Sequence, residues 1–347
     1  MPIEGPQNNT PETRLLADER FLRKIAYAYY EDGHSQEAIA EMEFCSRQTV
    51  SKALQKARER GIVRIFVVPD TRVGYLRNLS RDARIHLGLD DIVLVVGRSL
   101  KDLPEGAIQE DVVIEIAAAA AEYLDQLLTD TDILTVSGGK QFMRNVVRYL
   151  KPTKNLPHLN VVATLGFVEA HAGDGDANLV AYDIARAYGA QHTWFSAPAI
   201  SRQDWHIAEI RKFPLLREAV DLMERASVLM TGLWTPHSND EVIMEGILTR
   251  EELKLIDSYK PVVDINHWVF NADGCCINTL LDPPPYFLSG LRIHELKDQI
   301  KKIGTRSILV AGGSMAFIPA IRAALKAGVA NILITDHVTA QYLMEFE

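Results

Sequence analysis

The stretch DILTVSGGKQFMRNVV, residues 132–147, decides the fold class. Residues 133–136 form a short apolar run of the kind found in strands buried on both faces of a sheet. Ser137 and two glycines interrupt this run, and apolar residues then recur at helical spacing. The stretch therefore predicts a buried strand, a tight glycine turn and a helix, which together form the repeating unit of an α/β fold.

The same pattern recurs along most of the chain after Asp91. Because short runs of Val, Ile and Leu alternate with helical patterns, we expect a doubly wound, mostly parallel α/β domain over 91–347. The segment PVVDINHWVF at 261–270 is expected to be one strand that ends in a turn at 271–274. The other expected strands are DIVLVVG, DILTVSGG, LNVVATLG, SVLMTGLW, RSILVAGG and NILITD. The expected helices cover 105–128, 140–150, 178–188, 249–259 and 316–327.

Composition places the chain among ordinary globular proteins, with 47% apolar and 24% charged residues among 347. Residues 1–13 have neither the basic nor the apolar part of a signal peptide and are expected to be a disordered tail. No apolar run is long and uncharged enough to span a bilayer, so no membrane partner is expected. Three cysteines are too few for a disulfide framework. We therefore expect a reduced cytoplasmic protein of a bacterium, without metal or cofactor.

The N-terminal part has the spacing of a helix-turn-helix. Apolar residues recur at helical spacing over 14–30, and Ser35 is placed to cap a short second helix. Ser46 is placed to cap a third helix that runs to about Arg60, where Gly61 ends it. These signals predict an N-terminal helix-turn-helix domain over 14–68 and a linker over 69–90. The run IVRIFVV at 62–68 is either a wing of that domain or a first strand.

Charge and the helical wheel both favour duplex DNA as the partner of this motif. The net charge is −9, yet residues 44–68 carry six basic side chains against Glu59 alone. On the third helix, Val50 and Leu54 share an apolar face, and polar and basic side chains occupy the opposite face. Such side chains read base edges and hold phosphates. The side chains expected at the DNA are Arg47, Gln48, Thr49, Ser51, Lys52, Gln55 and Arg58.

The glycine turn after 133–136 is not a nucleotide-hydrolysing P-loop. That motif requires a hydroxyl residue after its lysine and a glycine five positions before the second glycine. Here Gln141 follows Lys140, and Leu134 occupies the glycine position. The turn still lets backbone amides approach a ligand, and Lys140 can bind a phosphate or form an imine with an aldehyde. The expected effector contacts in this turn are Ser137, Gly138, Gly139, Lys140 and Gln141.

Two further strand ends carry residues suited to a polyhydroxy ligand. Ligands of doubly wound sheets bind beyond the carboxyl ends of the strands. The run VVDIN places Asp264 and Asn266 near such an end, and VAGGSMAF places Gly312, Gly313 and Ser314 before a helix. Backbone amides and a carboxylate suit the hydroxyls of a sugar or polyol. We expect these residues to complete the effector site.

The chain resembles the SorC family of sugar-responsive bacterial transcriptional regulators over about 14–347. This resemblance implies a helix-turn-helix domain and an effector domain similar in fold to sugar-phosphate isomerases and deaminases. It also implies operator DNA as a partner, a homo-tetramer built as a dimer of dimers, and a sugar, polyol or sugar phosphate that modulates DNA binding. The family's phosphate-cradling turn falls on 137–140, and its aspartate falls on Asp264. The resemblance rests on 29–65, TVSGGK at 135–140, 177–200, VVDINHWVFNADG at 262–274 and 308–344.

The chain departs from the family pattern at the presumed pocket. Many members read DICGRFFD where this chain reads DINHWVFN, so His267 and Trp268 replace a glycine and an arginine, and Asn271 replaces an acid. Many members also carry a lysine soon after the AGG turn, which SMAF lacks here. These losses of basic groups weaken the case for a phosphorylated ligand, and Trp268 can stack on a sugar. Lys140, where many members carry threonine, argues in the opposite direction.

Three functions are compatible with these patterns. The first is a DNA-binding regulator, with repression of a carbohydrate or polyol catabolic operon as the expected activity. The second is a sugar-phosphate isomerase or deaminase on the same fold, with Asp264, His267, His171 and Glu169 as acid or base candidates. The third is a scaffold whose first domain only mediates assembly. An enzyme has no use for residues 14–64, and fold similarity alone does not establish activity, so we expect a regulator without catalytic residues.

Overall fold

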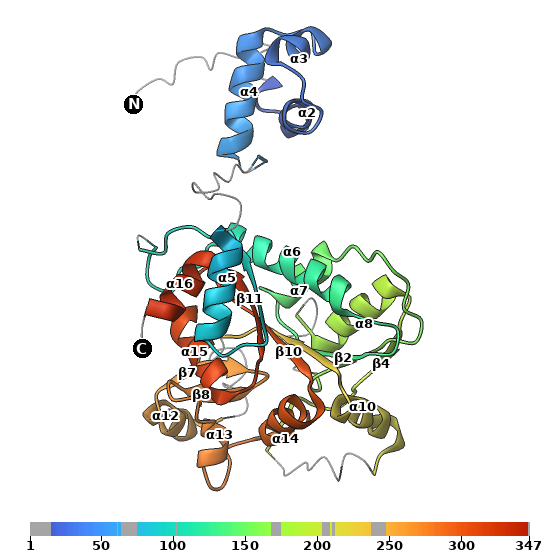
Figure 1. The fold of residues 1–347 in the computed structure, drawn as a ribbon, viewed down its shortest axis with the longest axis vertical. Coiled ribbons are helices and arrows are strands. Elements are labelled where there is room, and N and C mark those ends of the chain that lie inside the picture. Colours follow the sequence, from blue (N-terminus) through green and yellow to red (C-terminus); the bar gives the residue numbers. More distant parts are fainter. Residues whose placement is uncertain are drawn as a thin grey trace, which may run out of the picture. The chain divides into compact units, whose positions relative to one another are not determined.

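The computed structural model divides the chain into two compact units, Met1–Asp70 and Thr71–Glu347, which are described separately. Figure 1 shows the fold. Some expectations fall outside the described residues: the tail at 1–13, the helix end at Gly61, most of the run at 62–68, and Glu169 and His171. The described residues are 15–60, 62–63, 75–101, 103–167, 175–202, 209, 212–236 and 248–345.

The first unit contains the three expected helices. They are α2 (Glu19–Tyr30), α3 (Gln36–Met42) and α4 (Arg47–Glu59). The side chain of Ser35 accepts a hydrogen bond from the Ala38 amide, and Ser46 accepts one from the Thr49 amide, so both expected caps are confirmed. Because each helix is amphipathic, the three apolar faces close over one small core. That core includes Leu22, Ile25, Ile39, Val50, Ala53, Leu54 and Ala57.

The second unit is built on a seven-stranded sheet in the order β1-β11-β10-β6-β2-β3-β4, with every neighbouring pair parallel. Leu134 at the centre pairs with Val161 on one side and Val228 on the other. The expected parallel α/β architecture is therefore confirmed. The strands are β1 (Asp91–Val95), β2 (Ile133–Val136), β3 (Asn160–Ala163), β4 (Gln191–Thr193), β6 (Val228–Thr231), β10 (Arg306–Val310) and β11 (Ile332–Asp336).

Helices cover both faces of this sheet, which explains the continuous apolar runs of its strands. On one face α6, α7 and α8 pack side by side, while α10 packs on β2 and β3 from the other face (Figure 1). The C-terminal α16 packs against β11 and α15. The bounds are α6 (Glu110–Leu127), α7 (Met143–Tyr149), α8 (Ala177–Tyr188), α10 (Pro214–Glu224), α12 (Arg250–Ser258), α13 (Ile277–Leu280), α14 (Ile293–Asp298), η3 (Gln299–Ile303), α15 (Phe317–Ala327) and α16 (His337–Glu345).

The strand order places a topological switch point between β2 and β6. From β2 the chain steps outward through β3 to β4, and from β6 it steps the opposite way through β10 to β11. The connections that follow β2 and β6 therefore diverge at their carboxyl ends. In doubly wound folds this divergence opens the crevice in which ligands bind.

Two expectations about local structure are wrong. The expected linker contains helix α5 (Tyr75–His86), which packs on β1 and α16 and donates a hydrogen bond from the Ser80 hydroxyl to the Ile92 carbonyl. The expected single strand at 261–270 is a hairpin of β7 (Pro261–Ile265) and β8 (Trp268–Asn271), outside the main sheet. Periodicity misses the hairpin, because a two-residue turn hardly interrupts an apolar run. A second small ladder pairs β5 (Ile200–Ser201) with β9 (Phe287–Leu288).

Two expectations drawn from composition concern the helices and the cysteines. The described helices include none that is both long and apolar enough to cross a membrane. Cys45, Cys275 and Cys276 are free thiols. Cys45 packs against the core of the helix-turn-helix unit as a small apolar residue.

Candidate functional site

The candidate DNA-binding surface is the outward face of α4. Buried residues recur along the helix at Thr49, Val50, Ala53, Leu54 and Ala57 and attach it to α2 and α3. The polar and basic side chains between them point away from this core, as the helical wheel predicts. The exposed members of the expected DNA-binding set are Arg47, Gln48, Ser51, Lys52, Gln55 and Arg58.

Several of these side chains also contact one another or the neighbouring helix. Arg47 Nε lies 2.8 Å from Glu37 Oε1, and Gln55 Nε2 donates to Glu59 Oε1 at 2.8 Å. Both pairs are exposed, so they hold the side chains only weakly. A phosphate or a base edge can therefore displace Glu37 or Glu59 at little cost.

The assignment of Thr49 to the DNA contacts is wrong. Its side chain is 4% exposed, and its hydroxyl forms a 2.8 Å hydrogen bond with the Ser46 hydroxyl. Thr49 is the third residue of the helix, where the capping geometry turns its side chain inward. It supports the start of α4 rather than a DNA contact.

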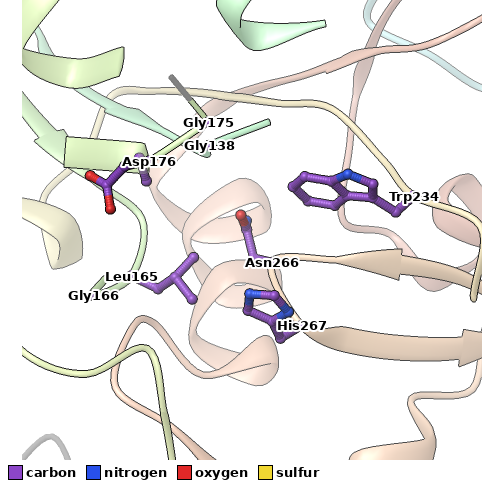
Figure 2. Close-up of a pocket in the computed structure, with 9 residues that line it drawn as sticks. Gly138, Leu165, Gly166, Gly175, Asp176, Trp234, Asn266 and His267 are labelled. Carbon is purple, nitrogen blue, oxygen red and sulfur yellow. The ribbon is translucent and has the colours of Figure 1, made fainter. Parts of the chain in front are cut away.

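A pocket lies at the switch point of the second unit. Its lining comes from the carboxyl ends of β2, β3 and β6, the start of α8 and the turn of the β7–β8 hairpin (Figure 2). It contains about 360 Å³ of space between atoms, its open mouth included. The described lining residues are Gly138, Leu165, Gly166, Gly175, Asp176, Ala177, Trp234, Asn266 and His267.

Two glycines let separate backbone segments meet at this pocket. A Cβ on Gly138 would lie 2.3 Å from the Gly175 carbonyl oxygen, and a Cβ on Gly166 would lie 1.8 Å from the Ala197 carbonyl oxygen. The Gly139 amide donates to the same Gly175 carbonyl at 2.9 Å. No side chain fits at either position, so the backbone itself forms this wall of the pocket.

The amide of Asn266 is held in place at the pocket wall. The Thr164 hydroxyl donates to Asn266 Oδ1 at 3.1 Å, which leaves the two Nδ2 hydrogens available to a ligand. Asn266 thus lies where the sequence predicts an effector contact. Its position depends on Thr164, which follows β3 and lies 102 residues earlier in the chain.

His267 follows Asn266 in the two-residue turn between β7 and β8. Both residues have positive φ angles, 53° and 64°, as a type I′ hairpin turn requires. Asparagine tolerates this conformation, whereas for other residues with a Cβ it costs roughly 1–2 kcal/mol. The imidazole is 4% exposed and lines the pocket (Figure 2). Strain of this kind persists where surrounding structure enforces it, and it often marks functional positions.

Asp264 supports this turn and is not among the described lining residues of the pocket. Its Oδ1 accepts from the His267 amide at 2.8 Å, and its backbone forms an isolated antiparallel bridge with Trp234. The carboxylate is buried at 2% exposure. Asp264 therefore acts as a positioning residue that joins the hairpin to the end of β6.

The rest of the glycine turn also lies outside the described lining. Ser137 is fully buried and accepts from the Gly232 amide at 3.3 Å, which ties β2 to β6. Gly139 packs against the Trp234 ring, and the exposed Lys140 extends beside Gly175. Helix α7 begins at Met143. The carbonyl of Gln141, two residues earlier, accepts a hydrogen bond from Asn145 Nδ2. Of the five residues expected in this turn, Gly138 alone is among the described lining residues.

The AGGS turn, whose residues are expected effector contacts, binds the protein's own carboxylate. The Gly313 amide donates to Asp336 Oδ2 at 2.9 Å, and a Cβ on Gly312 would lie 2.7 Å from the same oxygen. The Ser314 hydroxyl donates to the Ala107 carbonyl at 2.8 Å and is buried. The turn has the shape of an anion cradle, and Asp336 already fills it.

Trp268 lines a second, adjoining pocket. This second pocket shares the lining residues Leu165 and Asn266 with the first pocket, and its other lining residues are mostly apolar. The indole Nε1 of Trp268 donates to the Leu291 carbonyl at 3.3 Å, so its ring is fixed. Any stacking of Trp268 on a ligand therefore requires a ligand that extends past Asn266.

Sequence reasoning missed most of the pocket. Trp234 follows the run SVLMTG, and Gly166 follows LNVVATL, so both stand at strand ends that could have been included by the same rule. Asp176 precedes α8 as its cap and accepts from the Asn178 and Leu179 amides. Its signal was a capping residue, which usually has only a structural role.

Comparison with known proteins identifies the second unit. A family model described as "Putative sugar-binding domain" matches residues 74–345. The chain belongs to the SorC family. The sugar-binding domain of this SorC protein follows an N-terminal helical region, and the match begins one residue before helix α5.

Curated relatives of this SorC protein cover nearly its whole length. The "Deoxyribonucleoside regulator" of Bacillus subtilis (strain 168) is 25% identical over 92% of this chain and 96% of its own. The "Sorbitol operon regulator" of Klebsiella pneumoniae is 22% identical over 94% and 98%. An "Uncharacterized transcriptional regulator YjhU" of Escherichia coli (strain K12) is 24% identical over 96% of both chains. These relatives are named as transcriptional regulators rather than as enzymes.

The fold matches solved structures as well. The full-length sorbitol operon regulator SorC from Klebsiella pneumoniae superimposes with a TM-score of 0.64 at 22% identity, over 94% of this chain and 98% of that one. A DeoR family transcriptional regulator from Listeria monocytogenes gives 0.62 at 21% identity, over 77% and 99%. At such identities the match establishes the shared fold.

Proposed function

We propose that this SorC protein is a DNA-binding transcriptional regulator whose operator binding is modulated by a small carbohydrate-type effector. The observation that carries the proposal is the pairing, in one chain, of an exposed polar face on α4 with a pocket at the switch point of a sugar-binding domain. The relatives regulate transcription, which favours this function over the isomerase or deaminase alternative.

Each α4 would enter a major groove with its exposed face toward the base edges. Gln48, Ser51 and Gln55 are the candidates for base contacts, and Lys52 and Arg58 for phosphate contacts. A homo-tetramer, a dimer of dimers, would present paired helices to operator half-sites one helical turn apart. The test of assembly is the molar mass in solution by light scattering, with a tetramer as the expected result and a monomer as the contrary one.

Regulation requires that the effector bind one arrangement of the assembly better than another, because only differential affinity shifts an equilibrium. An effector held between Gly138, Asp176 and Asn266 contacts the turn after β2, the start of α8 and the β7–β8 hairpin. Binding there would draw the hairpin and α8 together, which gives the two arrangements different ligand affinities. Release of a repressor from a carbohydrate or polyol catabolic operon is the outcome that we propose.

The decisive experiment measures binding to DNA from the protein's own promoter region by fluorescence anisotropy at several salt concentrations. Affinity should fall steeply with salt, because phosphate contacts release counterions. Lys52→Ala should weaken binding and flatten the salt slope by about one unit. Lys254→Ala, which removes an exposed lysine from α12, is the matched control and should behave as the parent. A parent protein that ignores this DNA at low salt would overturn the proposal.

A further inference from the structure

Among the residues of the pocket, His267 is the one whose side chain is least explained by a structural role. The turn requires a left-handed residue, and glycine would adopt that conformation without strain. Its backbone is clamped on both sides: Asp264 accepts from its amide at 2.8 Å, and the Tyr286 hydroxyl donates to its carbonyl at 2.8 Å. The surrounding structure therefore places this particular side chain at this particular point.

The imidazole is buried without a hydrogen-bond partner among the described residues. Its Nδ1 is fully enclosed and lies 3.8 Å from Asp264 Oδ2, beyond hydrogen-bonding distance. A buried polar group without a partner costs free energy. In Figure 2 the ring borders the space between Asn266, Leu165 and Asp176. A ligand in this space would lie against the imidazole ring.

We propose that His267 determines the specificity of the effector pocket and selects an uncharged polyhydroxy compound over its phosphate ester. The inference rests on the proposed function and adds the chemical class of the effector. A neutral imidazole has one donor and one acceptor, and the Asn266 amide adds two donors. A hydroxyl group both donates and accepts, so neighbouring hydroxyls of a sugar or polyol match this pair.

The charges around the pocket disfavour a phosphate. The described lining contains the carboxylate of Asp176 and neither lysine nor arginine. Lys140 packs beside Gly175 but is not among the described lining residues, so a phosphate dianion would meet the Asp176 carboxylate without a basic group in the described lining.

The start of α8 offers no free anion site in its first turn. Asp176 Oδ1 accepts from the Asn178 amide at 2.8 Å and from the Leu179 amide at 3.2 Å. These are the amides that bind phosphate at helix starts in other proteins. Here the cap carboxylate occupies them, while its second oxygen remains able to accept from a ligand hydroxyl.

The test pairs a ligand panel with substitutions at two left-handed residues. Thermal shift is measured with D-ribose, D-glucose, D-mannitol and D-sorbitol and with the terminal phosphate ester of each. The most stabilising probe is then titrated by calorimetry into the parent, His267→Gly, His267→Asn and Lys260→Gly. Lys260 also has positive φ but is exposed at the end of α12, so its variant controls for relief of strain.

We expect an unphosphorylated probe to bind most tightly and its phosphate ester to bind roughly tenfold more weakly. His267→Gly should weaken the neutral probe by about fivefold or more, the value of one hydrogen bond. His267→Asn, which tolerates the turn and keeps a donor and an acceptor, should restore part of the affinity. Lys260→Gly should bind as the parent does.

Two results would overturn the inference while leaving the proposed function intact: a phosphate ester that binds more tightly than the neutral compound, or parental affinity in His267→Gly. Failure of every probe in the panel would count against this inference and against the effector half of the proposed function. DNA binding, measured separately, would still test the other half.

Discussion

The amide of Gly313 donates a 2.9 Å hydrogen bond to Oδ2 of Asp336, so the end of β10 is closed by the end of β11. The same carboxylate accepts from the Thr339 hydroxyl and from the Val338 and Thr339 amides, which caps α16. Asp336 is fully buried. The AGG turn thus binds an internal anion, whereas the candidate pocket is lined from the ends of β6, β2 and β3.

Asp336→Ala should destabilise the protein strongly. Each buried donor left without a partner costs about 1–3 kcal/mol, so the free energy of unfolding should fall by at least about 3 kcal/mol. Chemical denaturation provides the measurement, with the exposed Asp273→Ala as control. A folded Asp336→Ala protein of parental stability but altered effector affinity would show that the turn binds the effector after all.

Gly166→Ala should disrupt the pocket wall. The added Cβ would meet the Ala197 carbonyl oxygen at 1.8 Å, and both partners are backbone, so the strands must move apart. Overpacking of this kind costs typically about 1–3 kcal/mol or more. Gly232→Ala is the matched control, because its Cβ would lie 3.5 Å from Phe142 in ordinary contact. Similar melting temperatures for the two variants would contradict this account.

The exposed and buried faces of α4 should respond differently to substitution. Gln48→Ala or Gln55→Ala should each cost about 1–3 kcal/mol of DNA-binding free energy and relax specificity at one base. Thr49→Val should leave specificity unchanged, because this side chain is buried under the helix start. Selection of binding sites from a random DNA pool provides the readout. A changed consensus for Thr49→Val would refute the assignment of the two faces.

Asp132 should make stability depend on pH. Burial alone raises the pKa of its carboxyl, but hydrogen bonds from Ser227 and Thr129 and the charge of Arg306 outweigh burial and hold the pKa below its ordinary value. A lowered folded-state pKa stabilises the protein above the unfolded-state pKa, about 3.9, and this contribution is lost as pH falls toward the folded-state value. Asp132→Asn should therefore lower stability near neutral pH by about 1–3 kcal/mol, and the difference should shrink below about pH 4. Urea denaturation at several pH values measures it, and a constant difference would argue against this role.

Much of the architecture could be predicted from local patterns. The apolar runs at β2, β3 and β10 have no alternation, because helices cover both faces of the sheet. Ser35 and Ser46 cap their helices as their positions predict. These features depend on neighbours within a few residues, so the linear order of residues contains the necessary information.

The pocket could be predicted only in part, because its walls come from distant segments. Gly138 and Asn266 line the candidate pocket, whereas Ser314 and Asp264 have internal partners. A glycine turn can have the same amino-acid sequence whether its amides bind a ligand or a carboxylate from the next strand. Which one occurs depends on strand order, and strand order is a long-range property.

The sequence by itself determined the α/β class, the helix-turn-helix and the polar face of α4, since each follows from the spacing of side chains along one element. Only the tertiary structure decided that Asp336 occupies the AGG turn and that His267 borders the pocket. The physical reason is that a hydrogen bond between residues far apart in the chain depends on how strands pair, and local periodicity does not specify that pairing.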